Sequence, residues 1–117
     1  MPGIAGIFAA GKQKQVNQML DGIAHRGRDG RAVFELANAT LGTVWTGTSC
    51  SDATARVTGV EDHIDDGHFA RAQVVNGQPR LVRDPFGAAP LYCGRTEDGL
   101  LCFGSEIKAI LKVTHDV

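Results

Sequence analysis

The sequence has little that would mark a membrane-bound, secreted or nucleic-acid-binding protein. No apolar run approaches the roughly 20 residues of a membrane-spanning helix, and no signal-peptide pattern precedes the first apolar segment. The formal net charge of −1 lacks the positive excess of a dedicated nucleic-acid binder. Three cysteines, an odd number without a secretory context, favour free thiols over a disulfide framework. We therefore expect a cytoplasmic protein.

Aromatic residues are also scarce, whereas glycine is abundant. Five Phe, one Trp and one Tyr stand against 15 Gly in 117 residues, a balance that favours short strands joined by tight turns. The chain is 43% hydrophobic, enough to form a core and too much for a disordered chain. Its length predicts a single domain over residues 1–117.

Apolar periodicity predicts a helix near each end of the chain, with strands between them. Apolar residues recur on one helical face over Gln13–Ala24, and Ser105 is placed to cap a second helix that continues through Leu111. His25–Gly30 is predicted to be a polar loop. Short apolar or β-branched runs predict strands at Gly3–Phe8, Ala32–Leu36, Thr40–Thr46, Ala55–Val60, His68–Val75, Gln78–Arg83, Leu91–Gly94 and Leu100–Phe103.

Two turns predict how neighbouring strands pair. Asn76-Gly77 is a strong signal for a two-residue hairpin. A turn centred on Glu97-Asp98 would place Cys93 opposite Cys102 in the next hairpin. These two cysteines are then either small buried thiols or a cross-strand pair, and the first reading is preferred.

An acidic stretch lies in the middle of the chain. Glu61–Gly67 is predicted to be a solvent-exposed connection, because its carboxylates stand next to one another in pairs. With His63 and His68 it offers oxygen and nitrogen atoms to a metal ion, but it matches no known ligand spacing. We predict no metal site there, and no cofactor is expected for the chain.

Four segments, in order along the chain, resemble one family. They are Gly3–Phe8 (GIAGIF), His25–Gly30 (HRGRDG), Arg83–Tyr92 (RDPFGAAPLY) and Ser105–Leu111 (SEIKAIL). They are similar to the patterns CGIAGIF, HRGPDG, RDPFG-x-x-PLYY and SEIKALL of class II glutamine amidotransferase domains, in the asparagine synthetase branch. The resemblance implies an α+β fold of the Ntn-hydrolase type. This fold is an αββα sandwich, reduced here to packed antiparallel sheets with one or two helices.

The nucleophile position of that family is changed in this chain. In the family, the initiator Met is removed and the exposed Cys attacks the glutamine amide, with its own amino group as the base. Pro2 stands at that position here and carries no thiol. Glutaminase activity is therefore expected to be lost. One alternative stays open, in which a divergent hydrolase uses the amine of Pro2 or the thiol of Cys50.

The segments that hold glutamine in the family are missing as well. A basic strand of the family binds the glutamine carboxylate, but the corresponding strand here, Leu41–Thr46, contains no Arg. The family's NGEIYN-like segment, whose Asn and Gly form the oxyanion hole, has no counterpart. Asn76-Gly77 is instead interpreted as the hairpin between two strands. The middle of the family domain is thus interpreted as deleted, together with its substrate pocket.

These departures favour a non-catalytic protein that acts as a scaffold or regulatory subunit of a separate synthetase-like enzyme. In the family, the SEIKAL segment leads into a synthetase domain, whereas this sequence ends soon afterwards, at Val117. A strand edge or apolar face left uncovered by the deletion would pair with another chain. We therefore expect a homodimer, a synthetase-like protein partner, or both, and no nucleic acid or membrane partner.

A third hypothesis is a small module that binds an anion or an amino acid. Arg26, Arg28 and Arg31 gather with Asp29 around glycine turns, an arrangement that can hold a small anion. The proposed ligand-binding residues are Arg26, Arg28 and Asp29. The competing interpretation is a solvent-facing loop that is fixed by a salt bridge.

Overall fold

The computed structural model describes residues 3–27, 29–45, 55–56, 59–65, 68–75, 78–83 and 91–114. In chain order these residues form β1 (Gly3–Ile7), α1 (Gln13–Asp21), the 3-10 turn η1 (Ala24–Arg26), β2 (Gly30–Leu36), β3 (Ala39–Trp45), β4 (Ala55–Arg56), β5 (Gly59–Asp65), β6 (His68–Val75), β7 (Gln78–Arg83), β8 (Tyr92–Arg95), β9 (Leu101–Gly104) and α3 (Ile107–Ile110). No helix within these ranges is long and apolar enough to cross a membrane.

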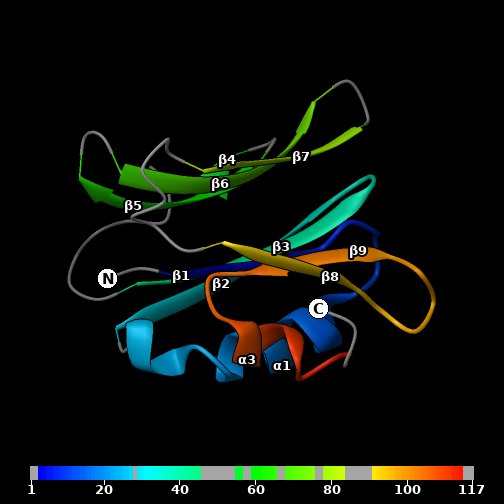
Figure 1. Ribbon diagram of the computed structural model, residues 1–117, viewed down its shortest axis with the longest axis horizontal. Helices are drawn as coiled ribbons and strands as arrows, with labels where there is room; N and C mark the ends of the chain where they lie inside the picture. The colour runs from blue at the N-terminus through cyan, green and yellow to red at the C-terminus, as the bar shows by residue number, and fades with distance from the viewer. Residues whose placement is uncertain are drawn as a thin grey trace.

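The strands form two antiparallel sheets that lie over a layer of helices (Figure 1). Sheet A has the strand order β2-β3-β1-β9-β8, and sheet B has the order β4-β5-β6-β7. Sheet B covers one face of sheet A, and α1 and α3 cover the other (Figure 1). The predicted α+β sandwich of packed antiparallel sheets with two helices is confirmed.

Sheet A is the middle layer and contributes to two apolar clusters. The first cluster includes the buried residues of α1 and α3, and the second includes residues of β6 and β7. The central strand β1 belongs to both, since Ile4 packs in the second cluster while Ala5 and Ile7 pack in the first. Because every residue of β1 is buried, its sequence is an unbroken apolar run and does not alternate with polar residues.

The predicted N-terminal helix is present but ends earlier than expected. Helix α1 buries Val16, Met19 and Leu20, which is the apolar face that the periodicity predicted. It ends at Asp21, before the poor helix former Gly22, whose N–H donates to the carbonyl of Met19 over 3.0 Å. The chain then turns through η1, so part of the predicted polar loop is helical. Ile23 stays buried through this change.

The register of the β8–β9 hairpin is shifted by one residue from the prediction. Cys93 lies opposite Phe103, and Cys102 lies opposite Gly94, so the two cysteines do not face each other. The cause is a three-residue loop closed by hydrogen bonds from Gly99 N–H and Leu100 N–H back to Thr96. Gly99 has φ 81°, the left-handed conformation that such loops require at their last position.

This shift places the two thiols in different environments. Side chains alternate between the two faces of a strand, so a slip of one residue moves Cys102 away from its expected neighbour. Cys93 is exposed, whereas Cys102 is buried in the helix-side cluster. The prediction that Cys93 faces Cys102 is therefore wrong.

The acidic stretch is part of a strand, contrary to the prediction of an exposed connection. β5 extends to Asp65 and pairs with β6 from Gly59↔Gln73 to Asp65↔His68, with an irregularity after His63. Acidic residues have low strand propensity, but pairing with a neighbouring strand outweighs such local preferences. The side chains of this stretch lie outside the described residues.

Most of the side chains that the structure describes on the outer face of the β6–β7 pair are polar. Ala72 and Leu81 pack toward sheet A, so the residues that alternate with them lie on the far side. These include Arg71, Gln73 and Arg80, which are partly or fully exposed. This part of sheet B can therefore face water without a covering helix.

The β6–β7 hairpin agrees with the predicted position of its turn. The two strands pair antiparallel, and the last pair of the register is Val75↔Gln78. Asn76 and Gly77 connect these two paired residues in the sequence, and they themselves lie outside the described residues.

Candidate functional site

Three of the four motif segments meet at the start of β1. Ser105 and Ile4 exchange hydrogen bonds, and a methyl group placed on Gly3 would lie 3.0 Å from Cδ of Arg26. Arg26 therefore packs beside the first residue of β1. Pro2, which precedes Gly3 in the chain, lies outside the described residues. The site thus adjoins the position at which the resemblance places the family nucleophile.

Ser105 holds the end of β9 against β1 and does not cap the following helix. Its hydroxyl oxygen accepts the Ile4 N–H over 2.9 Å, and its own N–H donates to the Ile4 carbonyl over 2.9 Å. These bonds extend the ladder beyond the pair Ala5↔Gly104. Glu106 takes the N-cap position of α3 without a side-chain cap. The prediction of Ser105 as N-cap is therefore wrong, because its side chain serves the sheet.

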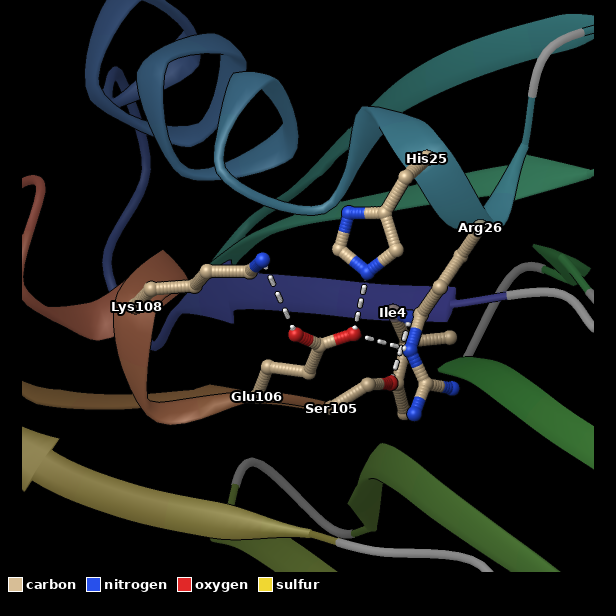
Figure 2. Close-up of polar contacts among 6 residues, drawn as sticks. All are labelled: Ile4, His25, Arg26, Ser105, Glu106 and Lys108. Carbon is tan, nitrogen blue, oxygen red and sulfur yellow. Dashed lines mark hydrogen bonds and ion pairs between the residues drawn. The ribbon is translucent and has the colours of Figure 1, made fainter.

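Glu106 is the centre of a charged network (Figure 2). Its Oε2 atom accepts hydrogen bonds from Arg26 Nε over 2.6 Å and from His25 Nε2 over 2.7 Å. Its Oε1 atom lies 3.5 Å from Lys108 Nζ. The Arg26 side chain is only 13% exposed, against 49% for His25 and 57% for Lys108. The Arg26–Glu106 pair is therefore the contact least screened by water.

The network keeps the Glu106 carboxylate in its charged form. Partial burial by itself raises the pKa of Glu106, since it disfavours charge. Hydrogen bonds from Arg26 and His25, and the positive charge of these groups, act in the opposite direction and prevail. The pKa of Glu106 is therefore below its ordinary value.

This shift predicts how stability depends on pH. An unfolded chain protonates Glu106 near the ordinary glutamate pKa of about 4.3, whereas the folded chain protonates it only at lower pH. We expect the contribution of Glu106 to be complete above about pH 5 and to be lost as pH falls through both values.

Urea unfolding at several pH values measures this contribution. The comparison is between the wild type and Glu106→Gln, which keeps the shape of the side chain and cannot ionise. We expect the wild type to be more stable near neutral pH and the difference to shrink as pH falls below about 4. Parallel curves for the two proteins would contradict the prediction.

Arg26 and Arg31, two of the arginines near the glycine turns, each have a carboxylate partner within the chain. Arg26 is paired with Glu106, whereas Arg31 Nη1 lies 2.9 Å from Oδ1 of Asp21 on α1. The Asp29 N–H donates to the carbonyl of Trp45 over 3.1 Å, at the start of β2. Arg28 lies outside the described residues. An anion at Arg26 would therefore compete with the carboxylate of Glu106.

The Glu106 network has no local signal in the sequence. Ser105 and Glu106 lie where a helix is predicted to begin, and His25 lies in the predicted polar loop. The available signal was charge. The segment HRGRDG carries His and Arg, and the segment SEIKAIL carries Glu. Their separation, 80 residues between Arg26 and Glu106, hides the contact from any local reading.

A family model described as a glutamine amidotransferase domain matches residues 37–112, which is more than half of the chain. The chain belongs to this family. A search of curated proteins found no match.

The residues matched to the glutamine amidotransferase domain include only part of the site. Ser105 and Glu106 lie within residues 37–112, whereas β1 and η1 precede them. The segments at Gly3 and at His25–Gly27 lie outside the matched residues, but they contact Ser105 and Glu106 within them.

An open groove lies next to the Glu106 network of the amidotransferase domain. It has a volume of about 530 Å³, and its lining includes Tyr92, Ile107 and Leu111. These are the large apolar side chains that the described part of the chain exposes, at 39%, 44% and 46%. Arg26 and Lys108 contribute to the same groove. Among the described residues, the most exposed large apolar side chains therefore lie together at this groove, beside two basic residues.

No metal-binding group is found among the described residues of the amidotransferase domain. Within that part of the chain, no three His, Cys, Asp or Glu side chains gather in a way that would hold an ion. Cys50, the alternative nucleophile, lies outside the described residues, as do residues 84–90 of the RDPFG motif.

Proposed function

We propose that this chain is a non-catalytic glutamine amidotransferase domain of the asparagine synthetase branch, acting as a scaffold or regulatory subunit of a separate synthetase-like enzyme. The proposed loss of catalysis rests on one observation. Pro2 stands directly before the GIAGI strand, where the family motif has its nucleophilic Cys. A proline has no side-chain group that can attack an amide.

The neighbourhood of β1 supports this proposal. One of the two strands that pair with β1 is β3. Its sequence, ATLGTVW, lacks the arginine that would hold a glutamine carboxylate. All but the last residue of β3 are buried. Gly42 lies against Val16 and Leu20 of α1, so this part of the strand serves packing.

The groove supports a protein partner. Tyr92, Ile107 and Leu111 offer apolar side chains to a partner, and Lys108 is exposed at the groove while Lys112 is exposed one turn further on. The Glu106 carboxylate already pairs with Arg26 and His25. The charged side chains that remain accessible to a partner here, those of Lys108 and Lys112, are therefore positive. We propose that a segment of the synthetase-like enzyme with apolar side chains flanked by carboxylates binds there.

Glutamate release from glutamine tests the loss of catalysis. We expect the purified protein to release no more glutamate than a heat-inactivated sample, because it lacks a thiol nucleophile. Pro2→Cys alone should not restore activity, because the carboxylate anchor and the oxyanion hole are missing as well. Turnover by the wild type would overturn the proposal, and turnover by Pro2→Cys would show that the pocket is intact.

Co-purification from native cells tests the subunit role separately. We expect a stoichiometric companion that mass spectrometry identifies as an ATP-dependent synthetase. Leu111→Asp should abolish its binding, because a carboxylate would replace an apolar contact, whereas Gln18→Ala on the exposed side of α1 should leave it unchanged. Equal recovery with Leu111→Asp would show that the groove is not the docking site.

Two other functions remain predictions. A divergent hydrolase would use the Pro2 amine or Cys50, and thiol labelling with loss of activity would reveal the second of these. An anion- or amino-acid-binding module would use Arg26, Arg28 and Asp29, and a thermal-shift screen of small anions and amino acids tests it. No described contact favours either function over the scaffold role.

A further inference from the structure

The two sheets have four edges, and they differ in how well they would accept another strand. β4 has two residues and β8 has four, while β7 contains Pro79, which has no N–H to donate. β2 has seven residues, contains no proline and pairs with β3 along its whole length. Among the described strands, none pairs with the other side of β2. An edge strand of this length that carries apolar side chains can pair with a strand of another chain.

Both faces of β2 are apolar at the centre of the strand. Val33 packs in the helix-side cluster, whereas Phe34 and Leu36 pack in the cluster between the sheets. All three remain partly exposed. Continuation of sheet A beyond β2 would therefore extend both clusters and remove apolar surface from water.

The charges of β2 are placed symmetrically about its middle residue. Arg31 and Glu35 lie two residues before and two residues after Val33. All three lie on the helix side of the strand. Val33 packs in the helix-side cluster, Arg31 contacts Asp21 of α1, and Glu35 accepts the N–H of Gly11 just before that helix.

We propose that β2 is a dimerisation edge, at which β2 of one chain pairs antiparallel with β2 of a second copy, with Val33 on the two-fold axis. This register places Arg31 opposite Glu35 of the second copy, and Glu35 opposite Arg31 of the second copy. It also places Phe34 opposite Ala32, a large residue against a small one. An interface of this kind is isologous and closes as a dimer. It joins the two copies of sheet A into one continuous sheet.

The existing contacts of the two charged side chains are compatible with this pairing. The Arg31–Asp21 pair is at the surface, with the side chains 33% and 63% exposed. A guanidinium has five N–H donors, so Arg31 can bind a second carboxylate. Glu35 accepts the Gly11 N–H with Oε1, and a carboxylate can accept with both oxygens. This dimer is independent of whether the chain hydrolyses glutamine.

Charge reversal tests the proposed register. Sedimentation velocity over micromolar to near-millimolar concentrations would be measured for the wild type, Arg31→Glu, Glu35→Arg and the double variant. Each single change puts like charges opposite each other twice in the dimer, so we expect its dissociation constant to rise about tenfold or more. The double variant restores opposite charges in both pairs and should recover the dimer.

Asp21→Ala is the matched control, because it removes the carboxylate that pairs with Arg31 within the chain and leaves the edge unchanged. It should dimerise like the wild type. Circular dichroism of each variant reports folding. As a measurement without any variant, amide hydrogen exchange of β2 should slow as wild-type concentration rises. A wild type that stays monomeric across the range, or equal dissociation constants for all four proteins, would overturn the proposal.

Discussion

Gly27→Ala is expected to lower the free energy of unfolding by about 3 kcal/mol or more. A methyl group at this position would overlap the backbone of β3 at Val44 and Trp45. β3 cannot move aside easily, because it pairs with β1 on one side and β2 on the other. Urea unfolding followed by the fluorescence of Trp45, the single tryptophan, measures the loss.

Gly11→Ala is the matched control for this prediction. Nothing lies within 4 Å of a methyl group at Gly11, but its φ is 75°. The expected loss is about 1 kcal/mol, from backbone strain alone. Equal losses in the two variants would mean that η1 moves away from β3 without much cost, contrary to the packing described here.

Glu106→Ala is expected to lower the free energy of unfolding by about 2 kcal/mol at neutral pH. The change removes the acceptor of two hydrogen bonds and leaves the largely buried Arg26 without this carboxylate. Losing one partner of a partly buried ion pair costs more than losing a surface pair, because the remaining charge is poorly solvated. Urea unfolding at neutral pH measures the loss.

Lys108→Ala is the control for the same network. Lys108 lies 3.5 Å from the other oxygen of Glu106, and its side chain is 57% exposed. Such a pair contributes about 0.5 kcal/mol or less. If Lys108→Ala and Glu106→Ala had similar effects, the network would be a surface feature with no special role for Arg26.

Gly27 and Glu106, the residues changed in these predictions, stabilise the fold, and they lie in the segments that resemble the family. Arg26 and Glu106 join η1 to the start of α3, while Ser105 fastens β9 to β1. Gly27 allows the chain to pass close to β3. Such residues are needed for the fold whether or not a nucleophile is present. The proposed loss of catalysis is therefore compatible with the persistence of the HRG and SEIKAIL motifs.

The sequence by itself determined the elements whose signals are local. The unbroken apolar run of β1 and the helical spacing of Val16, Met19 and Leu20 each identified an element, because burial imposes its own period on the residues. The family motifs identified the sandwich fold, and the two-residue turn at 76–77 identified the hairpin of β6 and β7. The proposal that Pro2 replaces the nucleophilic Cys of the family rests on the sequence as well.

Contacts between residues far apart in the sequence depend on the tertiary structure. The one-residue shift that separates Cys93 from Cys102 depends on how the loop around Gly99 closes. The strand character of Glu61–Asp65 depends on pairing with β6, against its own propensity. The contact of Arg26 with Glu106 joins residues 80 positions apart. Which distant residues come into contact depends on the order of the strands in the sheet, and no local pattern of residues encodes that order.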